Sequence, residues 1–114
     1  MSLDIYLTNK KCKKCGYSKP IEFDFNITHN LGKMASKCGL YYAMWRPEEL
    51  GIKKTKYIIP LLKEGIENLK EHKEFYLQFN PENGWGNYDN LLEQAENYLR
   101  VCLENPEAEI EINR

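Results

Sequence analysis

The sequence has no long apolar run and almost no net charge. A membrane-spanning helix needs about 20 consecutive apolar residues, and no stretch of this chain approaches that length. No signal-peptide pattern opens the chain, so we expect a cytoplasmic protein without a membrane partner. The formal net charge of −1 argues against a general affinity for nucleic acid.

The chain also lacks the motifs that mark common classes of enzyme. There is no nucleophile motif, no carboxylate cluster at metal-ligand spacing and no glycine-rich loop of the kind that cradles a phosphate. These absences favour a binding protein over an enzyme. Internal repeats, low-complexity segments and linkers are absent too, so residues 1–114 fit a single domain.

Hydrophobic periodicity predicts three strands and three main helices. Apolar and polar residues alternate over about residues 3–8, 21–28 and 107–113, as in half-buried strands. Helical spacing holds over about residues 31–38, 55–71 and 88–103, with short helical pieces near 41–45 and 75–79. The fold class is therefore α+β in the order β-β-α-α-α-β, a small, mainly antiparallel three-stranded sheet with helices on one face.

Particular residues are expected to begin or end these helices. Thr28 or Asn30 is available to cap the first helix, and Gly39 should end it in a left-handed conformation. Thr55 is a plausible cap for the helix that follows, and Asn87 for the last one.

Polar side chains gather where the second strand is expected to meet the first helix. Asn26, Thr28 and Asn30 share one parity and would project together if the strand persists, and His29 lies between them. A strand that opens onto a helix N-terminus is a common place for a ligand. The alternative is that these side chains only cap the helix or hold the neighbouring strand.

Two further groups complete the predicted ligand site. In the segment 80–88, glycines on both sides of Trp85 free the backbone to direct its ring, and Asn83 could orient a bound ring. The alternative is that Trp85 fills the small core. Arg46 offers a guanidinium for an anion, whereas Pro47 and the glutamates after it fit an ordinary helix start.

Cys12 and Cys15 have the spacing of half a zinc site. A metal there would need His29, another group or a second chain to complete its ligands. Plain surface thiols and redox chemistry are the alternatives. Cys38 and Cys102 lie on the apolar faces of their helices and are expected to be core residues.

Four blocks of sequence together resemble a family of small proteins found in bacteriophages and bacteria. The blocks are FNITHNLGKMA, WRPEELGI, NPENGWGNYDNL and NPEAEIEINR. The resemblance implies a phage or prophage setting and no particular reaction. The segment with Cys12 and Cys15 resembles a variable part of the family, which implies that a metal there would be a stabilising accessory.

The leading hypothesis is a small non-enzymatic binding protein. It would hold a small polar ligand, of nucleotide type for example, or a host protein at the strand–helix junction. One alternative is a hydrolase in which His29 is the general base and Glu48 or Glu82 its partner. Another is a zinc-clipped interaction module, and homo-oligomerisation is left open.

Overall fold

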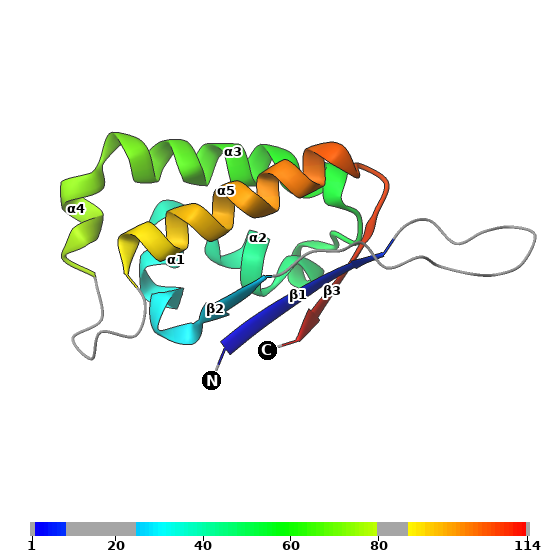
Figure 1. Ribbon diagram of the computed structural model, residues 1–114, viewed down its shortest axis with the longest axis horizontal. Helices are drawn as coiled ribbons and strands as arrows, with labels where there is room; N and C mark the ends of the chain where they lie inside the picture. Colours follow the sequence, from blue (N-terminus) through cyan, green and yellow to red (C-terminus); the bar gives the residue numbers. More distant parts are fainter. Residues whose placement is uncertain (1, 9–24, 80–86, 114) are drawn as a thin grey trace, which may run out of the picture.

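The computed structural model describes residues 2–8, 25–79 and 87–113, which form a three-stranded antiparallel sheet and a set of helices (Figure 1). The strands are β1 (Ser2–Thr8), β2 (Asn26–Thr28) and β3 (Glu109–Asn113), in the spatial order β2-β1-β3. Asp4 of β1 lies opposite Asn26 of β2 and Asn113 of β3. The predicted α+β class is confirmed. The part of the second strand predicted over 21–24 lies outside the described residues.

The described helices lie in the sequence between β2 and β3. They are the 3-10 turn η1 (His29–Leu31), α1 (Gly32–Cys38), α2 (Tyr41–Trp45), the 3-10 turn η2 (Pro47–Leu50), α3 (Thr55–Glu71), α4 (Lys73–Leu77) and α5 (Tyr88–Glu104). Figure 1 shows the long helices α3 and α5 side by side on one face of the sheet. The expectation that helices cover one face of the sheet is therefore confirmed.

The core lies between the sheet and these helices. The alternating residues Leu3, Ile5 and Leu7 of β1 are at most 1% exposed, which confirms the period-two pattern. The apolar faces of α3 and α5 meet them, because residues three and four apart lie on one face of a helix. The side chains of β1 that face the other way, such as Tyr6, stay in contact with solvent.

Two glycines allow the turn after α1 to pack closely. Gly39 ends α1 with φ = 92°, the left-handed conformation that the sequence predicted, and Leu40 is buried next to it. Leu40 lies against Gly65 of α3, where an ideal Cβ would be only 2.4 Å from Leu40 Cδ2. Glycine is therefore required at position 65 by close approach rather than by backbone conformation.

The cap predictions had mixed outcomes. Asn87 caps α5 as expected, because its side-chain oxygen accepts a hydrogen bond from the Asn90 N–H at 2.9 Å. The prediction of Thr28 or Asn30 as the cap of α1 was wrong. The turn η1 separates the strand from that helix, and Leu31 occupies the cap position without a side-chain bond.

The prediction of Thr55 as a cap was also wrong. Thr55 is the first residue inside α3, and Lys54 holds the cap position. Its hydroxyl instead donates to the Asn105 carbonyl at the end of α5. The Thr55 N–H donates to the Ala108 carbonyl at 3.0 Å, so the start of α3 is fixed to the segment between α5 and β3.

Candidate functional site

His29 is held by a buried tryptophan at the junction between β2 and α1. The short turn η1 places His29 directly after the strand, and α2 places Trp45 beside it. The indole N–H of Trp45 donates to His29 Nδ1 at 2.9 Å. Trp45 is buried and His29 half-buried. When the imidazole is neutral its own proton therefore lies on Nε2, which makes Nε2 a donor.

Arg46 is held by the same helix. The rings of Tyr41 and Trp45 lie one helical turn apart and stack, with centroids 5.7 Å apart and planes 18° apart. Arg46 Nε donates to the Tyr41 hydroxyl at 3.0 Å. This hydrogen bond, together with the neighbouring Glu49 carboxylate at 3.4 Å, raises the pKa of Arg46. The side chain stays a cation with a fixed direction.

These contacts join two residues that the sequence analysis proposed for a ligand site. His29 contacts Trp45, Trp45 stacks on Tyr41, and Tyr41 accepts from Arg46. We call these four residues the His29–Arg46 network. Tyr42 stands edge-on to Tyr41 with centroids 5.5 Å apart and is 52% exposed, so an aromatic surface adjoins the network.

Asn26 and Thr28 make contacts within the sheet. Asn26 Nδ2 donates to Asp4 Oδ1 at 2.7 Å on the open face of the sheet. Thr28 is half-buried and pairs with Ser2 at the end of β2. The strand stops at Thr28, and η1 follows it. The Asn30 side chain lies outside the described part of the structure.

The remaining predicted site residues lie outside the described residues. They are Asn83, Trp85, Cys12 and Cys15. The part of Asn83 and Trp85 in the predicted ligand site therefore stays a prediction, as does a zinc ion at the cysteine pair. Within residues 2–8, 25–79 and 87–113, no three His, Cys, Asp or Glu side chains gather to hold a metal ion.

Cys38 and Cys102 are buried, as their positions in the sequence predicted. Burial raises the pKa of the Cys38 thiol to about 11 and that of the Cys102 thiol to about 12. The Cys38 Sγ also donates to the Ala35 carbonyl at 3.4 Å. Both side chains are neutral core groups at physiological pH.

Sequence reasoning missed the residues that hold the network. Tyr41 was read only as part of a short helical turn, and Trp45 was grouped with Arg46 without a role of its own. Their four-residue spacing on a helix is a signal that two rings can stack. The role of Asp4 as a partner of Asn26 depends on the strand register, which the sequence did not specify.

No described helix combines the length and the apolar character that crossing a bilayer requires. Comparisons with family models, curated proteins and solved structures found nothing that matches this chain.

Proposed function

We propose that the protein is a non-enzymatic binding protein that holds a small polar ligand at the junction of β2, η1 and α2. The His29–Arg46 network supports this proposal, because the buried Trp45 and the partly buried Tyr41 hold two hydrogen-bond donors in place. The resemblance of the sequence to small phage and bacterial proteins supports a phage or prophage setting. A host protein is the alternative occupant of the same junction.

The single observation that carries the proposal is the hydrogen bond from Trp45 to His29. Because Nδ1 accepts from the indole, Nε2 of the neutral ring is a donor toward a ligand. The hydrolase hypothesis instead needs a ring nitrogen that can accept a proton from water or substrate. The geometry therefore favours a role for His29 in binding over a role as general base.

The donors indicate the chemistry of the ligand. An imidazole N–H and a guanidinium both bind oxygen acceptors, and a guanidinium is especially suited to phosphate and carboxylate. Arg46 is 40% exposed and Glu49 is 51% exposed, so a ligand anion can compete with this surface ion pair. The exposed ring of Tyr42 offers a surface for a base or another flat group. A nucleotide combines these features.

The first test is native mass spectrometry of the freshly purified protein. Retained mass would report a bound metabolite, a metal ion and the oligomeric state in one measurement. The second test is titration of 15N-labelled protein with AMP and, separately, with inorganic phosphate. We expect saturable shifts at His29 and Arg46 and at the indole N–H of Trp45.

Variants with matched controls make the test specific. Arg46→Gln should raise the Kd for AMP about tenfold, since it removes a charged donor. Arg100→Gln is the control, because Arg100 pairs with Glu104 at 3.3 Å much as Arg46 pairs with Glu49 at 3.4 Å. His29→Gln retains a donor and should bind within a few fold of the wild type.

Other results would contradict the proposal. An equal loss of affinity for AMP in the Arg46 and Arg100 variants would mean that binding depends on the net charge of the protein and not on Arg46. Turnover of a phosphoester that disappears in His29→Gln would favour the hydrolase. The absence of any retained metabolite, together with no saturable shift at His29 or Arg46, would remove the small-ligand site.

A further inference from the structure

The outer edge of β3 is only partly paired within the described chain. β1 pairs with β3 along its inner edge. On the outer edge Lys54 lies opposite Glu109, and the Ile110 N–H donates to the Lys53 carbonyl at 2.9 Å. The pairing stops there because Gly51, at φ = 73°, turns the chain between η2 and Lys53. The pairing on the outer edge therefore involves only Lys53 and Lys54.

The backbone of Ile112 faces this same outer edge. Residues two apart in a strand direct their N–H and C=O groups to the same side, and Ile112 follows Ile110 by two. Over the described ranges, no backbone group pairs with the N–H or the C=O of Ile112. Such an edge is a template for an additional strand.

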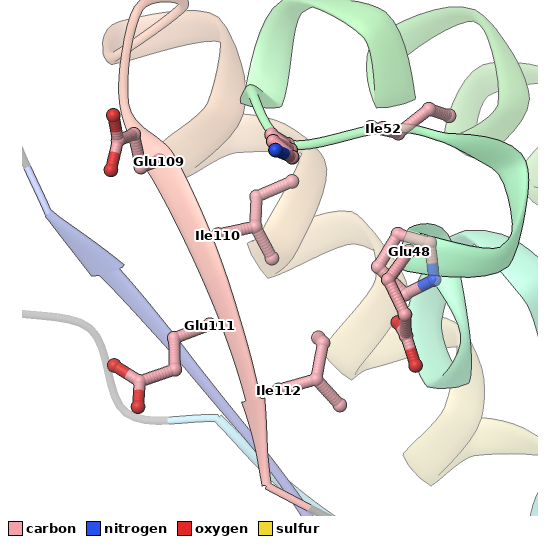
Figure 2. A pocket seen from close by; sticks show the side chains of 8 residues that line it. Glu48, Ile52, Glu109, Ile110, Glu111 and Ile112 are labelled. Carbon is pink, nitrogen blue, oxygen red and sulfur yellow. The ribbon is translucent and has the colours of Figure 1, made fainter.

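A groove of about 600 Å³ runs beside this edge (Figure 2). It is lined by Pro47, Glu48, Ile52, Lys53, Glu109, Ile110, Glu111 and Ile112. We call it the β3 groove. Figure 2 shows Ile110 and Ile112 on the side of β3 that faces η2, whereas Glu109 and Glu111 point to the opposite side of the strand.

The two isoleucines of the β3 groove are incompletely buried. Ile110 lies opposite Leu7, and Ile112 opposite Ile5, on the apolar face of the sheet. The two β1 residues are about 1% exposed, whereas both β3 residues are only partly buried. An apolar side chain supplied from outside would remove the remaining apolar surface from water.

Charge around the edge indicates a basic occupant. The described residues of the three strands include the carboxylates of Asp4, Glu109 and Glu111 and no Lys or Arg. The chain itself places Lys54 opposite Glu109 on this edge. A strand that continued in the same position would have a residue opposite Glu111, where a positive charge is favourable.

A second copy of the chain lacks the charge that this edge favours. The Ile110 N–H already pairs with the Lys53 carbonyl, so a copy of β3 could pair only with the remainder of the strand, which is centred on Ile112. An antiparallel pairing centred on Ile112 places Asn113 of the copy, which is uncharged, opposite Glu111. A basic segment supplies an opposite charge there, and a copy of β3 does not.

We propose that the outer edge of β3 binds an extended, basic segment of a partner protein as an added strand. The main chain of the segment pairs with Ile112, and its Lys or Arg lies opposite Glu111. The next side chain, which points the other way, is apolar and enters the β3 groove. This docking surface is separate from the His29–Arg46 network and goes beyond the small-ligand function.

Synthetic peptides provide the test. The probes are a blocked Lys-Val-Lys-Val-Lys peptide and, as the control of opposite charge, Glu-Val-Glu-Val-Glu. Each is titrated into the 15N-labelled full chain. We expect the basic peptide to give saturable shifts in β3 and to protect the Ile112 amide from hydrogen exchange. Its binding should weaken as salt is added, because the paired charges are exposed.

Variants separate the charge from the backbone contribution. Glu111→Lys should raise the Kd for the basic peptide about tenfold and reverse the preference between the two peptides. Glu93→Lys, at an exposed position of α5, is the matched control. It should leave the Kd for the basic peptide and the preference between the two peptides unchanged. Ile112→Pro removes the outward N–H and should abolish binding, whereas Ile112→Ala retains that N–H and should weaken binding less.

Several outcomes would overturn the proposal. These are equal binding of the two peptides, shifts centred outside β3, and no saturation by about 1 mM peptide. Self-association that is lost in Ile112→Pro, measured by sedimentation velocity, would assign the edge to a second copy instead. AMP binding is measured from shifts at His29 and Arg46, whereas peptide binding is measured from shifts in β3. Failure of one proposal therefore leaves the test of the other intact.

Discussion

Thr55 joins the start of α3 to the end of α5 through a buried hydroxyl group. Thr55 is fully buried, and its hydroxyl donates to the Asn105 carbonyl. Asn105 belongs to the segment that leads from α5 into β3. This hydrogen bond therefore fixes the chain immediately before the sheet edge.

We predict that Thr55→Val destabilises the fold by about 1 kcal/mol. Valine has nearly the same shape, so the change removes the hydroxyl and little packing. The loss is moderate because the Asn105 carbonyl still accepts from the Ala108 N–H at 3.2 Å. Urea unfolding would measure it, and an unchanged midpoint at the same slope would contradict it.

The limits of sequence reasoning are clear at single residues. Asn87 was correctly predicted as a cap because capping depends only on its own chain neighbours. Thr55 was not, because its partner Asn105 is 50 residues away and comes close only after α3 and α5 pack. The contact between His29 and Trp45, 16 residues apart, depends on packing in the same way.

At the scale of elements, the turn after α1 packs against α3 at Gly65. An ideal Cβ at this position would lie 2.4 Å from Leu40 Cδ2 and 2.5 Å from Leu40 Cγ. Leu40 is fully buried, so it has little room to move away. The close packing of the turn after α1 against α3 therefore depends on glycine, which has no side chain, at position 65.

We predict that Gly65→Ala destabilises the protein by about 1–3 kcal/mol through overpacking. Gly32→Ala is the control, because its Cβ would make an ordinary contact with Tyr41 at 3.8 Å. Gly32→Ala should be neutral or should stabilise the protein by about 0.5 kcal/mol, since alanine is the better helix former. Thermal melts of both variants test the pair, and a Gly65→Ala variant as stable as Gly32→Ala would contradict it.

The segment between α5 and β3 is also held to α3 by charge. Lys56 and Lys54 contact the Glu107 carboxylate at 3.0 and 3.3 Å. Their hydrogen bonds, that of Lys56 first, lower the pKa of Glu107. A lowered folded-state pKa gives stabilisation that is present above the unfolded pKa, about 4.3, and is lost as pH falls through the folded value.

We therefore predict a pH-dependent effect of Glu107→Gln. The variant should melt at a lower temperature than the wild type at pH 7, and the difference should shrink below pH about 4. Added salt should also reduce it, because the ion pairs are exposed. Glu67→Gln in α3 is the control at an exposed position. A difference that grows on acidification would contradict the assignment.

The sequence predicted the whole molecule better than it predicted the site. Alternation in β1 and helical spacing in α3 and α5 were sufficient for the fold class, since one large core uses all of these faces. The strand order β2-β1-β3 and the partly paired edge of β3 were not predicted. They depend on a crossover from β2 through the helices to β3, which local periodicity does not record.

The zinc hypothesis also belongs to the scale of the whole molecule. We predict that chelation, or replacement of both Cys12 and Cys15 by Ser, lowers the melting temperature without altering the affinity for AMP. An accessory metal would stabilise the fold and leave the His29–Arg46 network unchanged. A double variant that melts like the wild type would exclude a structural metal at this pair.

The alkylation rates of the two buried thiols would measure how often the fold opens locally. A thiol reacts with an alkylating reagent as the exposed thiolate, and Cys38 and Cys102 are both buried and neutral in the native state. In the Cys12 and Cys15 double Ser variant they are the remaining cysteines of the sequence. Their separate labelling rates would therefore report how often α1 and α5 come apart from the rest of the molecule, with no added probe.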